Sequence, residues 1–370
     1  MARDPSVGPA GHDGETEPAP VTLAQLGWGP FFAAQVDADE VVATPPVRVV
    51  TVHRSGFRVL GEGIEAKVPP RADVTVGDWL LFDRDTPAAS RALERSSLLK
   101  RRAPGHDRQV QLIAANIDTV FIVTSCNEDF NIARLERYVA LAFESGAEPV
   151  IVLTKTDLAT DAAPFITAAR GVSDRVAVVP LDARAEEPGK ALADWCRPGR
   201  TVAFLGSSGV GKSTLTNALA GSDDIATQAM READARGRHT TTRRQLYMVP
   251  CGSIVLDTPG MRELQLADAA SGIADVFEDI EALTTGCRFR DCAHDTEPGC
   301  AVQGAVAEGR LDPARLARWR KLQEEDAQNS VSLSDRRAKD RAFGKVVRQA
   351  TKDKQPTKDK QPTKDKPRNR

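Results

Sequence analysis

The sequence predicts an α/β core, with a small β-rich region before it and a short helical region rich in Cys and His after it. Three observations support this order. The apolar run Thr201–Leu205 is followed by a glycine-rich loop and then by Ser213–Ala220, the strand, loop and helix of an α/β unit. Short alternating strands occur from Val47 to Asp83, and three Cys and one His lie between positions 287 and 300.

Residues 1–44 are predicted to be a disordered acidic region. The first 40 residues carry seven acidic and one basic side chain and are rich in Pro, Gly and Ala. They show no basic segment followed by an apolar stretch of the signal-peptide type, and the chain has no run of eighteen apolar residues. We therefore expect a soluble, cytoplasmic protein without a membrane partner.

Residues 45–108 are predicted to form a small β-barrel, because their strands are short and closely spaced. Between Arg48 and Arg108 there are twelve Lys or Arg and eight Asp or Glu, a net charge of +4 (12 − 8). This charge favours an RNA-binding surface. Its candidate stacking residues are Phe57, Trp79 and Phe82, although Trp79 suits the core equally well.

The glycine-rich loop matches the phosphate-binding pattern Gly-x-x-x-x-Gly-Lys-[Ser/Thr] at every fixed position. Glycines let successive backbone N–H groups and the helix N-terminus surround phosphate oxygens. Lys212 would neutralise the outer phosphates, and the Ser213 hydroxyl would bind Mg²⁺. The predicted phosphate-site residues are Gly206, Ser207, Ser208, Gly209, Val210, Gly211, Lys212, Ser213 and Thr214.

Asp257-Thr258-Pro259-Gly260 follows a second apolar strand. Asp257 can hold Mg²⁺ and the Gly260 N–H can contact a terminal phosphate. The polar segment Gly237–Arg244 before it is suited to a nucleotide-dependent switch, in which Thr241 or Thr242 would close over Mg²⁺. His239 is read either as a surface residue or as a catalytic one. The tentative catalytic set is His239, Thr241 and Asp257.

Thr154-Lys155-Thr156-Asp157 follows the buried-strand pattern Pro149–Leu153 and predicts a guanine site. The Asp157 carboxylate can accept two hydrogen bonds from the guanine ring N–H and amino group, a pattern that adenine does not offer. Lys155 would lie across the base. Thr154 stands where asparagine is most usual, which weakens the motif taken alone. This motif precedes the phosphate loop, whereas ordinary GTPases have the opposite order.

The cluster Cys287, Cys292, His294 and Cys300 provides three thiolates and one imidazole within fourteen positions. This set matches one tetrahedral structural Zn²⁺ without an open position. The alternatives are four unrelated side chains or a disulfide pair, but nothing in the sequence indicates secretion. Such a short polar segment depends on the metal for much of its folding free energy.

The stretch Pro313–Glu325 has Leu316, Trp319 and Leu322 on one helical face and basic residues on the rest, so it is read as a solvated helix or an RNA-facing one. Residues 331–370 carry fourteen Lys or Arg and five Asp or Glu, and end in repeats of Thr-Lys-Asp-Lys. This composition predicts a disordered basic tail, which either solubilises the protein or attracts RNA.

The motifs together resemble the circularly permuted, ribosome small-subunit-dependent GTPases, the bacterial assembly factors known as RsgA or YjeQ. The resemblance covers roughly residues 45–325. Its further segments are Gln111–Ser125, Asp129–Ala142, Gly237–Thr242, Asp257–Leu264 and Cys287–Val302. Leu181-Asp182-Ala183 departs from the family, which usually has a Ser-Ala base-contacting loop.

The resemblance implies an α/β circularly permuted P-loop GTPase core with an N-terminal OB-fold barrel and a C-terminal α-helical zinc-binding domain. The implied boundaries are 45–108 for the barrel, 109–284 for the GTPase domain, 285–350 for the zinc-binding and helical domain, and 351–370 for the tail. The implied partners are GTP or GDP with Mg²⁺ and the small ribosomal subunit with its rRNA, bound by a monomer. GTP would favour binding during late subunit maturation, and hydrolysis would favour release.

Met261 follows the Asp-Thr-Pro-Gly motif, where Ras-type GTPases have a water-orienting glutamine. A methionine cannot orient water, so we expect slow intrinsic hydrolysis that the subunit stimulates, with Arg238 or Arg243 as further contributors beside His239. Two alternatives remain. One is a metabolic P-loop ATPase or kinase; the other is a zinc-stabilised RNA-binding protein that uses nucleotide only as a conformational sensor.

Overall fold

The computed structural model describes residues 21–102, 110–185, 188–221, 244–257 and 268–329. The chain divides into two compact units. The core unit contains the described residues up to Asp257 and the segment Ser271–Glu278. The C-terminal unit contains residues 268–270 and those from Asp279 onward.

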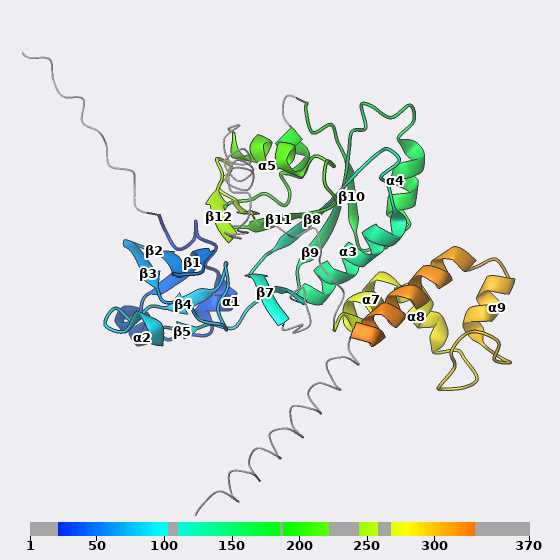
Figure 1. The fold of residues 1–370 in the computed structure, drawn as a ribbon, viewed down its shortest axis with the longest axis horizontal. Helices are drawn as coiled ribbons and strands as arrows, with labels where there is room; N and C mark the ends of the chain where they lie inside the picture. Colours follow the sequence, from blue (N-terminus) through cyan, green and yellow to red (C-terminus); the bar gives the residue numbers. More distant parts are fainter. Residues whose placement is uncertain (1–20, 103–109, 186–187, 222–243, 258–267, 330–370) are drawn as a thin grey trace, which may run out of the picture. The chain divides into compact units, whose positions relative to one another are not determined.

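The core unit is built on one long mixed sheet with the strand order β10-β9-β8-β11-β13-β12-β1-β2-β3 (Figure 1). Five neighbouring strands are parallel, as expected for buried strands of an α/β core. They are β8 (Thr119–Ser125), β9 (Glu148–Thr154), β10 (Ala177–Pro180), β11 (Thr201–Leu205) and β13 (Ile254–Asp257). The strand β12 (Arg244–Met248) pairs antiparallel with β13.

Helices cover both faces of these parallel strands. On one face, Leu215 and Leu219 of α5 (Lys212–Ala220) share a buried cluster with Phe121 and Val123 of β8. Alternate residues of a strand point to opposite faces, so Val120 and Ile122 face the other side, where α3 (Ile132–Ser145) packs on β8 and β9. The helix α4 (Ala163–Arg170) packs on β9 and β10, and the short helix η2 (Pro188–Leu192) packs against α5. The predicted strand–loop–helix unit is thus confirmed.

Among the described residues, the N-terminal strands show no closed barrel of the predicted kind. They are β1 (Pro46–His53), β2 (Gly56–Gly61), β3 (Ile64–Val68), β4 (Trp79–Leu81) and β5 (Arg91–Ala92). The pairs β3–β2, β2–β1, β1–β4 and β4–β5 make an open succession, and within the described residues β3 and β5 do not pair to close it. An OB-fold is therefore not confirmed.

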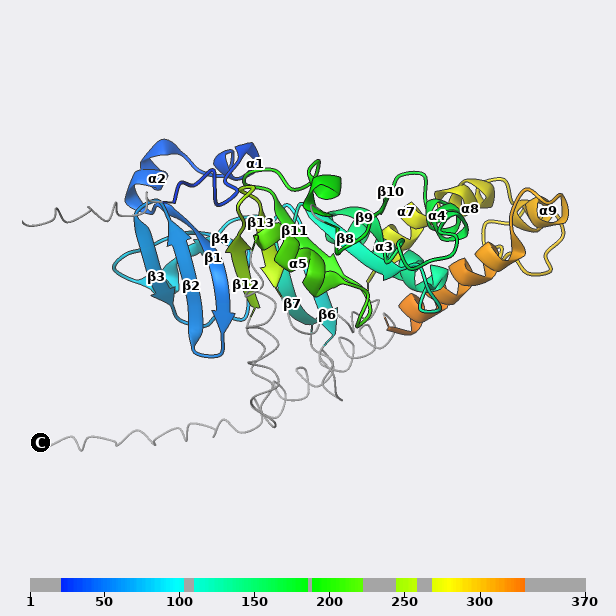
Figure 2. The same ribbon diagram turned by 90° about the horizontal axis from the view of Figure 1, so that it is seen from above.

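The strand β1 joins these strands to the sheet of the α/β core, because its two halves pair with different strands on one side. Its first residues, Pro46 to Arg48, pair with β4, whereas Thr51 and Val52 pair with β12. A register shift between Val49 and Thr51 separates the two halves. The N-terminal strands consequently continue the sheet of the α/β core, and Figure 2 follows this order from β3 to β8.

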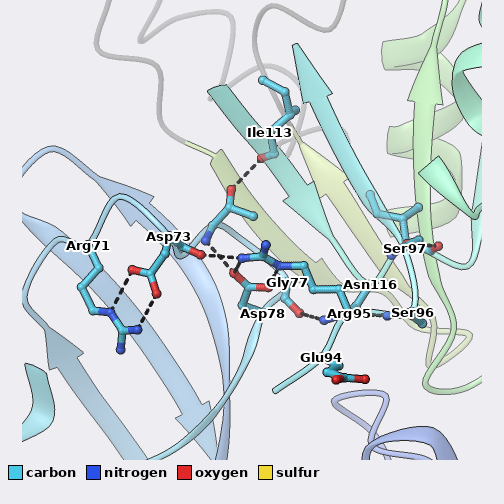
Figure 3. A network of polar contacts seen from close by, with 12 residues as sticks. Arg71, Asp73, Gly77, Asp78, Glu94, Arg95, Ser96, Ser97, Ile113 and Asn116 are labelled. Atoms are coloured by element: carbon cyan, nitrogen blue, oxygen red, sulfur yellow. Dashed lines mark hydrogen bonds and ion pairs between the residues drawn. The ribbon is translucent and has the colours of Figure 1, made fainter. Parts of the chain in front are cut away.

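A buried polar network ties the N-terminal strands to the hairpin of β6 (Leu98–Arg102) and β7 (Val110–Ala115) (Figure 3). The Asp78 carboxylate accepts hydrogen bonds from the Thr75 N–H at 2.7 Å and from the Arg95 guanidinium at 2.6 and 2.7 Å. The Asn116 amide donates to the Gly77 carbonyl at 2.9 Å. Because Asp78 is fully buried, these bonds offset the cost of removing its charge from water.

Residues 21–44 differ from the predicted disorder. They form α1 (Pro30–Ala33) and α2 (Ala38–Ala43), and Asp37 caps α2 by accepting from the Glu40 N–H at 2.7 Å. The Trp28 ring lies 4.9 Å from the Trp79 ring, centroid to centroid. The acidic and Pro-rich average composition concealed this apolar cluster, which comprises Leu26, Trp28 and Phe32 of the segment with Trp79, Leu81 and Leu93. The first twenty residues and residues 330–370 lie outside the described part.

The chain continues through α7 (Ala270–Val276), α8 (Glu278–Thr284), α9 (Ala301–Ala307) and a helix over residues 313–329. Leu316, Trp319 and Leu322 are all buried, so the apolar face predicted for the last helix is confirmed. Among the described helices, none combines the length and the hydropathy that crossing a membrane requires.

Candidate functional site

The predicted nucleotide motifs meet at one edge of the parallel sheet. The Thr-Lys-Thr-Asp motif begins at the last residue of β9, the phosphate loop follows β11, and Asp257 is the last residue of β13. Since β9, β8, β11 and β13 are neighbouring parallel strands, their carboxyl ends lie at the same edge. Ligands of open α/β sheets bind at this edge.

The phosphate loop has the backbone that its glycines allow. Gly206 has φ +145°, and a Cβ atom there would lie 2.1 Å from the Val123 carbonyl oxygen, so no other residue fits without moving β8. The Lys212 Nζ donates to the Gly206 carbonyl at 2.8 Å and also to the Ser207 carbonyl. Ser213 and Thr214 are exposed in the first turn of α5. The lysine and the helix N-terminus thus face the loop.

Thr154 connects the guanine motif to the phosphate loop. Its side chain is fully buried, and its hydroxyl lies 2.6 Å from the Val210 carbonyl oxygen and 3.2 Å from the Thr124 carbonyl oxygen. The sequence reading treated Thr154 only as a missing amide, but here its hydroxyl bonds the phosphate loop directly. Lys155 follows in the left-handed region with φ +57°, and the Asp157 side chain is exposed.

The segment after β10 also reaches this edge. The Leu181 N–H donates to the Leu153 carbonyl at 2.9 Å, beside the start of the guanine motif. A Cβ atom placed on Gly211 would lie 3.6 Å from Thr154 Oγ1 and 3.7 Å from the Ala183 Cβ. The Asp182 carboxylate accepts from the Arg184 N–H at 2.8 Å, which closes a tight turn. The segment Leu181-Asp182-Ala183, which differs from the usual Ser-Ala loop of the family, therefore lies beside the guanine motif and the phosphate loop.

The Thr154 contact yields a testable expectation. In Thr154→Val the hydroxyl is replaced by a methyl group, which leaves the buried Val210 carbonyl without this donor at a cost of about 1 kcal/mol or more. Because this bond holds the phosphate loop beside the guanine motif, the affinities for GTP and GDP should fall together, by up to about fivefold for each 1 kcal/mol of this cost. Titration with a fluorescent guanine nucleotide measures this loss. Thr154→Ser keeps the hydroxyl and should bind like the parent protein; equal affinity of the Val variant would contradict the proposed contact.

Several predicted site residues cannot be placed. His239, Thr241 and Thr242 lie outside the described residues, as do Gly260 and Met261. Asp257 is placed by its strand position alone. The catalytic and magnesium-binding assignments of His239, Thr241 and Asp257 therefore stay predictions.

The four Cys and His side chains come together in the C-terminal unit and could hold a metal ion. Their ligand atoms all lie within 4.8 Å of one another. The Cys287 Sγ is 3.4 Å from the His294 Nδ1 and 3.9 Å from the Cys300 Sγ. The Cys300 Sγ is 3.6 Å from the same nitrogen. The Nδ1 atom of His294 is therefore the ring nitrogen that faces the sulfur atoms.

Residues that the motif did not predict hold this cluster in place. Both Glu297 oxygens accept backbone N–H bonds, from Ala293 and from Asp295 at 2.8 Å each. The backbone N–H groups of Glu297, Ala293 and Asp295 lower the pKa of the Glu297 carboxyl to about 2. In the sequence, the only indication of this role is that Glu297 is an acidic residue between the two candidate metal ligands His294 and Cys300.

The His294 backbone is also held, with φ +60°. Its carbonyl accepts hydrogen bonds from the Gln303 amide at 2.6 Å and from the Arg320 guanidinium. The Trp319 ring lies 5.6 Å from the imidazole, centroid to centroid. Two residues of the helix over residues 313–329 thus support the cluster: Trp319 packs near the imidazole, and Arg320 donates to the His294 carbonyl.

Several residues that the sequence suggested for RNA binding are buried or form ion pairs within the protein. Phe57, Trp79 and Phe82 are all buried in the core, so they are not available to stack on bases. Arg48 is buried as well. Four more arginines of the N-terminal strands and their connections form ion pairs: Arg58 with Glu65, Arg71 with Asp73, Arg91 with Glu40 and Arg95 with Asp78.

In the basic helix over residues 313–329, two arginines also bind acidic residues within the protein. Arg315 makes two bonds to the Asp279 carboxylate, at 2.7 and 2.8 Å, and Arg320 lies 3.7 Å from Asp295. Both arginines therefore have partners within the C-terminal unit, so an RNA contact is not needed to account for their presence in this helix.

Proteins of similar sequence cover most of the chain. The family model described as RsgA GTPase matches residues 92–267. "Small ribosomal subunit biogenesis GTPase RsgA 2" of Vibrio vulnificus (strain CMCP6) is 46% identical over 343 residues, which is 92% of this chain and 98% of the relative. "Small ribosomal subunit biogenesis GTPase RsgA" of Mesorhizobium japonicum (strain LMG 29417 / CECT 9101 / MAFF 303099) is 50% identical over 337 residues, 89% of this chain and 96% of the relative.

Two solved structures share the fold. YjeQ from Thermotoga maritima has a TM-score of 0.55 at 23% identity, covering 76% of this chain and 98% of its own. YloQ, described as a circularly permuted GTPase, has a TM-score of 0.52 at 23% identity, covering 76% of this chain and 95% of its own. The permuted order of motifs read from the sequence agrees with this fold. On the identity over nearly the whole length of its relatives, the chain belongs to the RsgA family of GTPases.

Proposed function

We propose that this protein hydrolyses GTP in the late maturation of the small ribosomal subunit, with GTP favouring binding to the subunit and hydrolysis favouring release. The observation that carries the proposal is the meeting of a guanine motif, a phosphate loop and the Asp257 strand end at one sheet edge. The names of the relatives at 46% and 50% identity support the ribosomal role.

The site residues take the following roles. Asp157 reads guanine, Lys155 lies along the base and Lys212 neutralises the outer phosphates. Ser213, Thr241 and Asp257 hold Mg²⁺, which supplies charge neutralisation between the phosphates. The chain's own loop backbone from Gly206 to Gly211 provides the N–H groups for the phosphate oxygens.

The Cys/His cluster holds one structural Zn²⁺ in this proposal. Tetrahedral zinc with Zn–S bonds of about 2.3 Å places two sulfur atoms about 3.8 Å apart. The Cys287 and Cys300 sulfur atoms are 3.9 Å apart, which supports zinc at this site. All four positions are filled by protein ligands, so the ion has a structural role.

The protein acts as a monomer in the cytoplasm and contacts rRNA of the subunit. The ion pairs of the N-terminal strands leave fewer cations for RNA than the sequence suggested, so rRNA contacts must draw on other basic residues, such as Lys100 and Lys321. An RNA-binding protein that only senses nucleotide is not favoured by the GTPase family assignment.

The test is the rate of phosphate release from GTP and from ATP, with and without purified small ribosomal subunits. We expect slow GTP turnover alone, because Met261 cannot orient water, and a rise of about tenfold or more with subunits, which corresponds to about 1.4 kcal/mol. ATP should not be hydrolysed at the GTP rate. If subunits leave the rate unchanged, the ribosome-linked proposal is wrong, and comparable ATP turnover would indicate a metabolic ATPase instead.

A further inference from the structure

The chain alternates between the two units a few residues after the Asp-Thr-Pro-Gly motif. Asp268 lies eight residues beyond Gly260 (268 − 260). Residues 268–270 belong to the C-terminal unit, Ser271–Glu278 belong to the core unit, and the chain returns to the C-terminal unit at Asp279. Two consecutive short segments are thus assigned to different units.

The first segment is held within the C-terminal unit by Asp326. The Ala269 N–H donates to the Asp326 Oδ1 at 2.9 Å. Ala269 is fully buried and Asp326 is 8% exposed, so this bond is shielded from water. A charged acceptor on a buried N–H is among the stronger hydrogen bonds in a protein, and its loss leaves the N–H without this acceptor.

The second segment, α7, is held within the core unit by α3. The Glu144 carboxylate accepts from the Ser271 hydroxyl at 2.7 Å and from the Gly272 N–H at 3.2 Å. A Cβ atom on Gly272 would lie 2.0 Å from the Ala140 carbonyl oxygen, so the close approach of the two helices requires glycine. Asp275 adds an ion pair with Arg175 at 2.5 Å.

Only Ala270 separates the Asp326-held residue Ala269 from the Glu144-held residue Ser271. Consecutive Cα atoms are about 3.8 Å apart across a trans peptide, so one residue provides almost no slack between two fixed points. The segment that follows the terminal-phosphate strand in GTPases changes conformation with nucleotide state. If the backbone moves at Asp268, the movement would therefore change the hydrogen bond between Ala269 and Asp326. The contact of α7 with α3 would stay in place, because Glu144 holds Ser271.

We propose that Asp326 is a positioning residue that transmits the nucleotide state from the exit of the Asp-Thr-Pro-Gly segment to the metal-bearing C-terminal unit. Asp326 touches neither nucleotide nor metal ligand in this role. It acts through the Ala269 backbone. The inference rests on guanine-nucleotide binding by the core unit and is independent of the ribosomal partner.

The experiment compares amide hydrogen exchange of the full-length, metal-loaded protein bound to GDP or to a non-hydrolysable GTP analogue. In the parent protein, peptides from residues 279–329 should exchange differently in the two states. Asp326→Ala should reduce this difference by roughly fivefold or more, while its nucleotide affinities and metal content stay at the parent values. Asp326→Asn keeps the Oδ1 acceptor and should retain the difference. Glu324→Ala removes an exposed carboxylate of the same helix and serves as the matched control.

The proposal is overturned if the parent protein shows no nucleotide-dependent difference in these peptides, or if Asp326→Ala keeps all of it. Should Asp326→Ala fail to fold, Gly272→Ala tests the same joint from its other end. The added Cβ would displace α7 from α3, so the difference should shrink as well, and its full retention would contradict the proposal. No ribosomal subunit enters the measurement, so failure here is separate from failure of the proposed ribosomal function.

Discussion

Removal of the proposed Zn²⁺ from the Cys287–Cys300 cluster is expected to unfold the ligand loop and loosen the C-terminal unit around it. Structural Zn²⁺ sites contribute on the order of 10 kcal/mol, which is comparable to the whole stability of a domain. The loop from Gly286 to Cys300 has little apolar packing of its own, since only Cys300 among these residues is buried. Without the metal, hydrogen bonds such as those of Glu297 and His294 would have to hold it. Cys292→Ser should lose the metal and the protection of this loop, measured by metal analysis and limited proteolysis.

The controls follow from the distribution of cysteines. Cys251 is exposed and lies in the core unit, outside the cluster, so Cys251→Ser should keep the metal and the parent proteolysis pattern. Trp319 provides a second readout, because its ring packs on the His294 imidazole and its emission should shift as this contact opens. A Cys292→Ser protein that retains both the metal and the protected loop would show that the cluster does not depend on all four ligands.

Lys212→Ala is expected to lower GTP turnover by roughly 10² to 10³, because a preorganised charge at the transferring phosphate is lost. The fold should be largely unaffected, because the Lys212 Nζ donates to two carbonyls of its own loop, those of Gly206 and Ser207. Turnover is measured as phosphate release under saturating GTP, and thermal unfolding of the same sample monitors stability.

Lys212→Arg separates charge from fit, because the planar guanidinium does not replace a compact ammonium in a tight loop. It should be nearly as inactive as the alanine variant. Lys67→Ala, an exposed lysine on β3, is the matched control and should hydrolyse GTP at the parent rate in the absence of subunits. Parent-level turnover by Lys212→Ala would remove the phosphate loop from the mechanism.

The sequence predicts the structure most closely where function depends on a local pattern of residues. Thr201–Leu205 was expected as a strand and is β11 with the same bounds, and the helix expected from Ser213 begins one residue earlier at Lys212. The four cluster residues were identified by residue type and spacing, and their ligand atoms all lie within 4.8 Å of one another. Glycine-rich loops and Cys/His sets have fixed spacing because their chemistry acts over a few residues of backbone.

The differences arise where distant segments decide the outcome. Alternating strands after Val47 predicted a barrel, but the pairing of Thr51 with Gln245 joins segments almost two hundred residues apart in an open sheet. Average composition suggested disorder through residue 44, yet Leu26 and Phe32 pack with Trp79. Trp79 was considered a possible RNA contact until its burial against Trp28 placed it in the core.

By itself, the sequence determined the chemistry of this protein: a guanine motif ahead of a phosphate loop, and a Cys/His set of zinc type after them. Tertiary structure alone decided how these parts are connected. The Thr154 hydroxyl reaches the phosphate loop, Glu297 and Trp319 hold the Cys/His cluster, and Asp326 holds the Ala269 backbone. The physical reason is that ligand type and spacing are local properties of the chain, whereas hydrogen bonds across 56 or 57 positions depend on which elements the fold brings together.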